Sequence, residues 1–398
     1  MAYAVFEADS AGEIDLPTAK PLRGTYDEAE GMGLFMSVQP CEDFFFGGYL
    51  RCTPPLPFVY ELILLDSVDR ELTRIPIKKH WMHPRLERTE IEEDGFCGTL
   101  FKPPGDGPYP AVIDISGTGG GLHEHKGSML ASEGFVVLCV AFFQYKTLVH
   151  TLEEVEIEYF KKPIEWLKRQ PFTNDRLGIQ GVSFGGTIVN LLATRYPQIN
   201  TVVSINGPHI QSDYINIKEN GKLLPQPDLE ADRYHYFINR IVVTDKVIKH
   251  AAVSEETEIP WHRIPKSTSF RLVVCFLPGV EKLYPDICAQ GSVDDLVSSS
   301  VFASRYMAKR LAETGHEVEV HLVNGGHIME PPYFPHHDKV FAKFQGFCCG
   351  YGGEVVLHGK SQEVSWAGTI DFFTRKLGQP AEMPDWDRLG HEEIRSNL

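Results

Sequence analysis

Short, continuously apolar runs alternate with amphipathic segments over most of the chain from Gly98 onward. Six of these runs are expected to form strands, and most are rich in Val and Ile: 110–115, 135–142, 177–181, 201–205, 270–275 and 317–323. Hydrophobicity that continues instead of alternating is typical of parallel strands buried on both faces. The pattern therefore predicts a sheet at the centre of a large core.

The segments between these runs have helical periodicity. Apolar residues recur at helical spacing within 160–167 and 303–311. Pro163 is expected to kink or restart the first helix, and Gly315 stands where the second helix is expected to end. Strands that alternate with helices predict a mostly parallel sheet with right-handed crossovers.

The N-terminal region, from position 1 to position 80, has a different pattern. It combines a Pro-rich turn at 54–57 with short β-type runs at 34–38 and 58–65, and no convincing helical period comes before Arg74. These features predict a small all-β module over 1–80, followed by a larger α/β domain over 81–398.

The alternation of strands and helices is interrupted between the strand that ends at 205 and the strand that starts at 270. The excursion at 207–269 is mixed and polar, with no clear strand of the main sheet. In an open α/β sheet, ligands bind at the carboxyl ends of the strands, so this excursion is interpreted as a cap over a site. A surface insertion without function is the alternative.

The composition argues mainly against certain partners and locations. Lys+Arg 38 against Asp+Glu 54 gives a net charge of −16, so nucleic acid is not expected as the main partner. The longest apolar runs, about nine residues, are too short to span a bilayer, and no signal peptide is expected. The eight cysteines form no CxxC pair, which predicts reduced, buried thiols.

The sharpest chemical motif is Gly-x-Ser-x-Gly at 181–185, with Ser183 at its centre. It follows the apolar strand at 177–180 and precedes a helical pattern at 187–194. A strand, a sharp turn and a helix in this order are typical of the nucleophile elbow of α/β-hydrolases. Ser183 is therefore predicted to be a nucleophile, and an ordinary strand–helix junction is the alternative.

A serine hydroxyl is a weak nucleophile until a base removes its proton. In this fold the acid and then the histidine follow the serine along the chain. His327 follows the last predicted strand, and either Asp294 or Asp295 follows the strand before it, ahead of a helix. One aspartate is expected to orient the histidine and the other to cap the helix. A plain turn residue is the alternative for His327.

A glycine-rich loop at 116–121 follows the strand at 112–115. The backbone N–H groups of Phe184 and of Thr118 in this loop are predicted to form an oxyanion hole. The loop lacks the Lys-Ser/Thr ending of a phosphate-binding loop and the spacing of a dinucleotide fingerprint, so nucleotide binding is the weaker alternative.

Two histidine pairs, His123/His125 and His336/His337, raise the question of a metal site. Neither pair has a third partner at ligand spacing, and a solvated surface is the preferred interpretation. Neither a metal nor a cofactor is predicted.

Further motifs extend along nearly the whole chain. They lie at 15–21, 24–26, 31–35, 98–101, 103–105, 113–114, 117–121, 205–207 and 326–335. The run from His327 to Pro335 is highly specific. Together with Ser183, these motifs resemble the family of acyl-coenzyme A thioesterases related to bile acid-CoA:amino acid N-acyltransferase.

The resemblance implies that fatty acyl-CoA is hydrolysed to free acid and CoA through an acyl-enzyme. Carried over by position, the triad is Ser183, Asp295 and His327. Asp295 fits the family's spacing to the following helix, whereas Asp294 fits the distance from Gly291 equally well. The choice between the two aspartates stays open.

The implied substrate is acyl-CoA, although the whole chain is acidic. A local basic entrance near the glycine loop is therefore expected. Lys126, Lys146 and His336 are the candidate CoA contacts, and no oligomeric state is predicted.

The chain departs from the family pattern in three ways. Its first module is shorter than the family's, and 275–290 looks like an insertion before the acid, which is the main support for an inactive variant. The nucleophile is Ser, whereas the amino-acid-conjugating branch is expected to use Cys. A Ser oxyester is better matched to water than to amines, so hydrolysis is favoured over conjugation.

Two alternatives to a thioesterase remain: N-acyl transfer to an amino acid, and an inactive protein that binds acyl-CoA. The tripeptide Ser396–Leu398 resembles a weak variant of the peroxisomal Ser-Lys-Leu address. A peroxisomal location is therefore expected, with a cytoplasmic one as the alternative.

Overall fold

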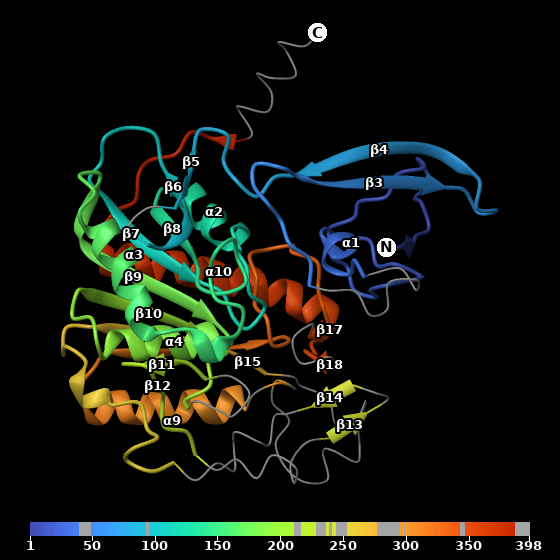
Figure 1. Cartoon of the computed structure of the whole chain (residues 1–398). Helices are drawn as coiled ribbons and strands as arrows, with labels where there is room; N and C mark the ends of the chain where they lie inside the picture. Colours follow the sequence, from blue (N-terminus) through green and yellow to red (C-terminus); the bar gives the residue numbers. More distant parts are fainter. Residues whose placement is uncertain are drawn as a thin grey trace.

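An eight-stranded sheet forms the centre of the molecule (Figure 1). The computed structural model describes residues 1–39, 49–92, 95–210, 216–227, 236–238, 241–243, 253–276, 295, 297, 299–342 and 347–386. The strands of the sheet are β5 (Glu87–Ile91), β6 (Cys97–Lys102), β7 (Tyr109–Ile115), β8 (Val136–Ala141), β9 (Thr173–Val182), β10 (Ile199–Ile205), β15 (Ser269–Phe276) and β16 (Val318–Asn324).

The sheet is mostly parallel, as predicted. Its order is β16-β15-β10-β9-β7-β8-β6-β5, and the neighbours from β16 to β8 pair in parallel. Strand β6 pairs antiparallel with both β8 and β5. Every residue of β8 is buried, which explains why the central runs are continuously apolar.

Helices cover both faces of this sheet. They are α2 (His125–Ser132), α3 (Lys161–Lys168), α4 (Phe184–Ala193), α9 (Ser300–Glu313) and α10 (Val355–Leu377). Alternate strand residues enter two core clusters: one includes α3, α4 and α9, and the other includes α2 and α10. Pro163 lies in the first turn of α3, after the 3-10 helix Ile157–Phe160, so the helix restarts there.

The described part of the N-terminal region, 1–39 and 49–80, holds two small antiparallel pairs and one helical turn. These elements are β1 (Ala4–Val5), β2 (Arg23–Gly24), α1 (Gly33–Met36), β3 (Phe58–Leu65) and β4 (Glu71–Lys79). Strands β3 and β4 form a two-stranded ribbon that extends away from the central sheet (Figure 1). The division of the chain between positions 80 and 81 stays a prediction.

The expected β-type run at 34–38 is wrong, because α1 occupies most of it. Met36 is buried in this turn, and a Cβ added to Gly359 of α10 would lie 2.4 Å from the Met36 Cγ. The turn therefore packs directly on α10. A short apolar run does not distinguish a strand from one buried helical turn, and here tertiary packing decides.

The described parts of the excursion contain short strands and a 3-10 helix. These are β11 (Lys218–Glu219), β12 (Lys222–Leu223), β13 (Tyr236–Ile238), β14 (Ile241–Val243) and Trp261–Arg263. Strands β13 and β14 join β18 (Phe347–Gly350) and β17 (Lys339–Ala342) in a second sheet of order β13-β14-β18-β17. Whether the excursion caps a site stays a prediction.

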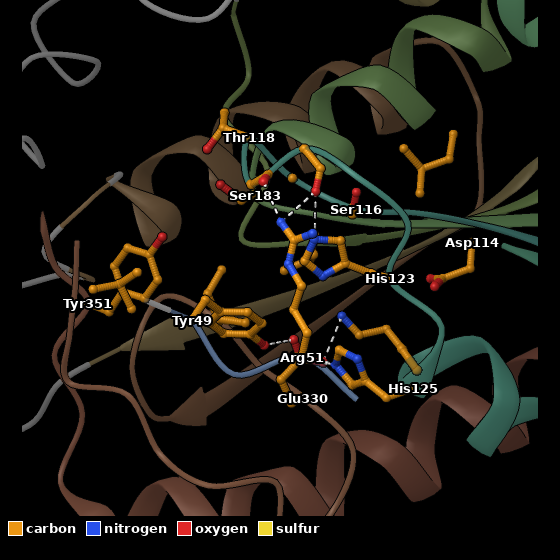
Figure 2. Close-up of a pocket in the computed structure, with 18 of the residues that line it drawn as sticks. Tyr49, Arg51, Asp114, Ser116, Thr118, His123, His125, Ser183, Glu330 and Tyr351 are labelled. Atoms are coloured by element: carbon orange, nitrogen blue, oxygen red, sulfur yellow. Dashed lines mark hydrogen bonds and ion pairs between the residues drawn. The ribbon is translucent and has the colours of Figure 1, made fainter. Parts of the chain in front are cut away.

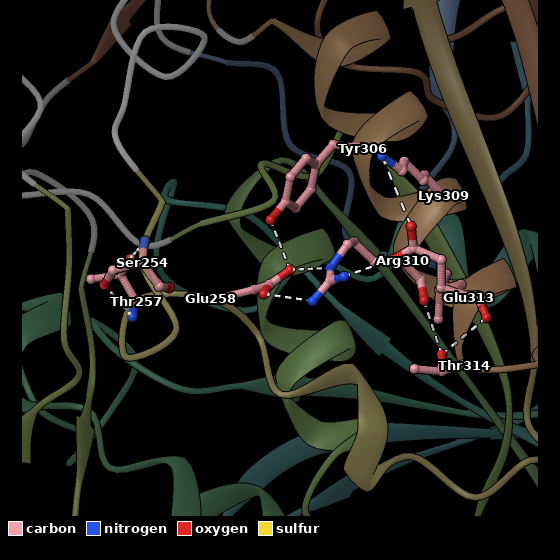
Figure 3. Close-up of polar contacts among 9 residues, drawn as sticks. Ser254, Thr257, Glu258, Tyr306, Lys309, Arg310, Glu313 and Thr314 are labelled. Atoms are coloured by element: carbon pink, nitrogen blue, oxygen red, sulfur yellow. Dashed lines mark hydrogen bonds and ion pairs between the residues drawn. The ribbon is translucent and has the colours of Figure 1, made fainter.

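The returning end of the excursion is fixed to α9 by Glu258 (Figure 3). Its carboxylate accepts hydrogen bonds from the Tyr306 hydroxyl at 2.7 Å and from Arg310 Nη2 at 2.9 Å. Trp261, three positions further along the chain, is buried in the core. Residues 277–290 of the predicted insertion and the tripeptide Ser396–Leu398 lie outside the described residues.

Candidate active site

Ser183 stands on a sharp turn between β9 and α4, with φ +56°. The turn brings backbone against backbone. A Cβ on Gly181 would lie 2.2 Å from the carbonyl oxygen of Gly185, and a Cβ on Gly185 would lie 2.5 Å from that of Ser116. Any larger residue at these two positions would force the turn apart, which explains the Gly-x-Ser-x-Gly spacing.

Three side chains predicted from the sequence form one hydrogen-bonded row. The Ser183 Oγ lies 2.8 Å from His327 Nε2, and His327 Nδ1 lies 2.8 Å from Asp295 Oδ2. His327 is 2% exposed and Asp295 is fully buried, so solvent does not compete for the bond between them. Asp294, the alternative acid, lies outside the described residues.

The loops that carry the histidine and the acid are held by further hydrogen bonds. The Asp295 carboxylate also accepts from the Val297 N–H at 2.8 Å and from the Ser300 hydroxyl. The His327 N–H donates to the Tyr351 carbonyl at 2.8 Å, and the Asn206 amide donates to the His327 carbonyl at 2.6 Å. The last two bonds hold the backbone N–H and carbonyl of His327, and so fix the position from which the imidazole extends.

A cavity of about 420 Å³ opens beside Ser183, and the glycine loop at 115–120 lines it (Figure 2). Thr118 is part of this lining, and Phe184 is the first residue of α4. A Cβ on Gly117 would lie 3.1 Å from the Ser183 Cβ, so the loop passes directly over the serine. Thr118 and Phe184 as oxyanion donors stay a prediction.

Glu330 forms a buried charged cluster in the wall of the cavity. Its carboxylate accepts from the Tyr49 hydroxyl, and it lies 2.9 Å from His125 Nε2 and 3.2 Å from Lys126 Nζ. Burial alone would raise the pKa of Glu330, but Lys126 and His125 outweigh it and hold the pKa well below its usual range. Glu330 is therefore ionised at neutral pH.

Asp114, at the end of β7, is a second buried acid in the lining. Burial raises the pKa of Asp114 to about 6, against an attraction from Lys126 that lowers it. Its carboxylate accepts a hydrogen bond of 2.9 Å from Gln180 Nε2. A polar residue inside the apolar run 112–115 was the sequence signal for this position.

Arg51 reaches the cavity from the N-terminal region. Its Nη2 donates to the carbonyl oxygens of Gly119 and Gly120, both at 2.8 Å. Figure 2 shows the side chain extending toward the end of the cavity where Ser183 and Thr118 lie. No sequence signal pointed to Arg51, because its partners lie 68 and 69 positions further along the chain.

The three candidate CoA contacts do not line a basic entrance. Lys126 is buried and paired with Glu330, and Lys146 is paired with Glu90 at 3.2 Å. His336 is buried, and its Nε2 lies 3.1 Å from the Gly353 carbonyl. Among the described residues that line the cavity, Arg51 is a cation that contacts the glycine loop directly.

The solvated surface expected for the histidine pairs is wrong. His125 and His336 are buried, and His123 and His337 are partly buried. The rings pack in aromatic surroundings; His125, for example, stacks on Phe334 with 4.6 Å between ring centroids. No group of three metal-ligating side chains is found in the described parts of the chain.

Two family models match the chain. The model described as "BAAT / Acyl-CoA thioester hydrolase C terminal" matches residues 155–277 and 279–379. The model described as "Acyl-CoA thioester hydrolase/BAAT N-terminal region" matches residues 1–93. This chain belongs to the acyl-CoA thioester hydrolase/BAAT family. Its mostly parallel sheet with an elbow after β9 is the α/β-hydrolase fold.

Curated relatives in this family include both thioesterases and an acyltransferase. A peroxisomal succinyl-coenzyme A thioesterase of Mus musculus is 30% identical, over 95% of this chain and 86% of its own length. Acyl-coenzyme A thioesterase 1 of Rattus norvegicus is also 30% identical, with the same coverage. An acyl-coenzyme A amino acid N-acyltransferase 1 of Mus musculus is 31% identical, over 94% of this chain and 87% of its own length.

Solved structures of hydrolases are similar to part of the chain. An acylaminoacyl peptidase of Pyrococcus horikoshii has a TM-score of 0.43 and 16% identity, covering 77% of this chain and 43% of its own. An esterase of Pyrococcus furiosus has a TM-score of 0.42 and 14% identity, covering 74% and 91%. Within the described residues, no helix is long and apolar enough to cross a membrane.

Proposed function

We propose that this member of the acyl-CoA thioester hydrolase/BAAT family hydrolyses acyl-CoA to a free acid and CoA, with Ser183 as nucleophile. The observation that carries the proposal is the row of two 2.8 Å hydrogen bonds from Ser183 through His327 to Asp295. The family membership supplies the class of substrate. Asp295, rather than Asp294, is proposed as the acid because its carboxylate reaches the imidazole.

In the first step, the Ser183 Oγ attacks the thioester carbonyl carbon while His327 Nε2 takes the hydroxyl proton. Asp295 accepts the Nδ1–H bond and stabilises the imidazolium that forms. The N–H groups of Phe184 and Thr118 are assigned to donate hydrogen bonds to the negatively charged oxygen that was the carbonyl oxygen. When the C–S bond breaks, the imidazolium returns its proton to the sulfur, and CoA leaves as the thiol.

In the second step, His327 removes a proton from a water molecule, and the resulting hydroxide attacks the ester carbonyl of the acyl-serine. Collapse of this intermediate breaks the bond to Ser183 Oγ, which regains its proton from His327. The products are the free acid and the regenerated serine.

Hydrolysis is favoured over amino-acid conjugation because the nucleophile is an oxygen. A serine oxyester is less reactive toward amines than a cysteine thioester, and water reaches it without a second binding site. The peroxisomal location stays a prediction, since one relative carries that location in its name and another, a rat thioesterase at 28% identity, carries a mitochondrial one.

The test is release of CoA from a series of acyl-CoA substrates, followed with a thiol reagent. The native protein is expected to release CoA and free acid, and Ser183→Ala is expected to lose at least about a thousandfold in kcat, because the nucleophile is absent. Ser304→Ala is the matched control, since Ser304 is a buried serine on α9 whose hydroxyl donates to the Val301 carbonyl of its own helix.

The two alternatives give different results in the same assay. With glycine or taurine present, an N-acyltransferase would form the conjugate in preference to free acid. An inactive acyl-CoA-binding protein would bind the substrate and release no CoA. CoA release that persists in Ser183→Ala would contradict the proposed mechanism.

A further inference from the structure

Arg51 is held against the active-site loop by backbone carbonyls instead of by a carboxylate. Its two short bonds go to Gly119 and Gly120, and a Cβ on Gly121 would lie 2.5 Å from its Nη1. Glycine at 121 therefore leaves the space that the guanidinium occupies. The side chain has five N–H donors, and two carbonyl bonds leave donors for a further partner.

The charge on Arg51 is not matched by an acid in the described part of the cavity. The other lysine or arginine in the described lining is Lys126, which lies 3.2 Å from Glu330 and also faces Asp114. Within the described residues, no ion pair joins Arg51 to a carboxylate. Arg51 is exposed, so a ligand can reach its guanidinium, and a guanidinium without a counter-ion among the described lining residues favours an anionic ligand.

Arg51 is also close to the reacting serine. The same loop connects the two groups: Gly117 passes over Ser183, and Gly120 accepts from Arg51. The chain from Gly117 to Gly120 spans at most about 11 Å even when fully extended. An anion bound by Arg51 therefore belongs to a part of the substrate near the thioester.

Two parts of an acyl-CoA carry anionic groups. The phosphates of CoA lie at the far end of the pantetheine arm, many bonds from the sulfur. A carboxylate at the end of a short acyl chain lies a few bonds from the thioester carbonyl. The short separation along the loop favours the second source.

We propose that Arg51 is a specificity-determining residue that binds the terminal carboxylate of a short dicarboxylic acyl group, so that such acyl-CoA thioesters are preferred over neutral ones of equal length. This inference rests on the proposed hydrolysis. It also fits the lining, which is polar at Tyr49, His123 and Gln144 as well as at Arg51. Tyr49, His123 and Gln144 are hydrogen-bonded within the protein, so they make the wall polar while Arg51 keeps donors for the ligand.

His123 supports the same role without competing for the anion. Burial, with Arg51 nearby, lowers the pKa of His123 to about 3, so the ring is neutral at physiological pH. Its Nε2 lies 3.1 Å from the Gly120 carbonyl, the same acceptor that Arg51 uses. The ring thus helps to hold the loop while Arg51 carries the positive charge.

The test compares kcat/KM for succinyl-CoA with butyryl-CoA, and for adipoyl-CoA with hexanoyl-CoA, in the native protein, Arg51→Gln and Arg51→Lys. The native protein is expected to prefer the dicarboxylic member of at least one pair. Arg51→Gln should lower its kcat/KM about 10- to 100-fold, the effect of one charged hydrogen bond, and change the neutral member less than about threefold. Arg51→Lys should restore part of the loss. Arg305→Gln, an exposed arginine on α9, is the control.

Thioesters of N-acetylcysteamine separate the two anion sources, because they carry no phosphate. If Arg51 binds the acyl carboxylate, the selective loss in Arg51→Gln persists with succinyl-N-acetylcysteamine. A loss that affects dicarboxylic and neutral CoA thioesters equally, and disappears with the truncated thioesters, assigns Arg51 to the phosphates and overturns the proposal. A native protein that prefers the neutral member of both pairs also overturns it.

A binding measurement tests the role of Arg51 independently of the proposed hydrolysis. If no substrate releases CoA, hydrolysis fails, but Arg51 is still expected to bind the carboxylate. Calorimetric titration with succinyl-CoA and butyryl-CoA on Ser183→Ala should then show tighter binding of succinyl-CoA, lost in Ser183→Ala/Arg51→Gln. Equal affinity for the two ligands in this measurement would contradict the role of Arg51.

Discussion

Strand β8 of the central sheet and strand β3 of the β3–β4 ribbon are both largely apolar, but they differ in burial. Every residue of β8 is buried, whereas in the ribbon Val59 is 62% exposed and Leu64 is 49% exposed. The sheet is covered by helices on both faces and holds Ser183 and His327 within hydrogen-bonding distance. Most residues of β3 are exposed instead, and an isolated two-stranded ribbon is marginally stable in water.

The N-terminal region still reaches the chemistry, but through the segment before the ribbon. Tyr49 donates to Glu330 across 281 positions of the chain, and Arg51 donates to the glycine loop. The sheet and the loops that follow its strands hold Ser183, His327 and Asp295 within hydrogen-bonding distance. The N-terminal region supplies two side chains to the wall of the cavity, where we expect substrates to be distinguished.

A pair of leucine truncations tests the energetic side of this comparison. Leu192 on α4 is fully buried in the core, so Leu192→Ala is expected to lower the free energy of unfolding by about 2–5 kcal/mol. Leu64 lies on the exposed ribbon, so Leu64→Ala should change it by less than about 0.5 kcal/mol. Urea unfolding followed by circular dichroism measures both. Equal losses would mean that the ribbon is as tightly packed as the sheet.

Asp114, in the wall of the cavity, is expected to have a smaller effect on the unfolding free energy, and this effect depends on pH. Its pKa rises from 3.8 to about 6 on folding, so the native state binds the proton more tightly than the unfolded state. The stabilisation from this group is complete below about pH 4 and is lost as the pH rises through 6. The unfolding free energy of the native protein minus that of Asp114→Asn should therefore fall over this interval, by at most about 3 kcal/mol.

The asparagine variant keeps an acceptor for Gln180 and leaves Lys126, His125 and Glu330, the groups that face Asp114, in place. These three groups titrate in both proteins, so the difference between the two unfolding free energies reports on Asp114 alone. A difference that does not change with pH would show that Asp114 is solvated in the native state.

The sequence was most informative where local pattern and tertiary structure agree. The strand runs 110–115 and 201–205, and the helical pattern at 303–311, were predicted because their apolar period directly reflects burial in β7, β10 and α9. The elbow at 181–185 was predicted because its strained turn admits little besides glycine at two positions.

Features made by distant contacts were not predictable in the same way. The helical turn α1 depends on packing against α10, which lies near the opposite end of the chain, and nothing within 34–38 encodes it. Arg51 and Glu330 make their contacts with the glycine loop and with Tyr49 only when the N-terminal region packs against distant parts of the chain. His125 and His336 were misassigned because the rings that pack on them, Trp81 and Phe334 on His125 and His358 on His336, are distant from them in the sequence.

Asp295 and His327 are proposed to make Ser183 a nucleophile. Labelling with a fluorophosphonate probe, followed by mass spectrometry of the modified peptide, tests it without any choice of substrate. We expect a single phosphonylated residue, Ser183, in the native protein, and at least about a hundredfold slower labelling in Asp295→Asn, whose amide does not stabilise the imidazolium. A native protein that does not label, or that labels at another residue, would show that Ser183 is not activated by these two side chains.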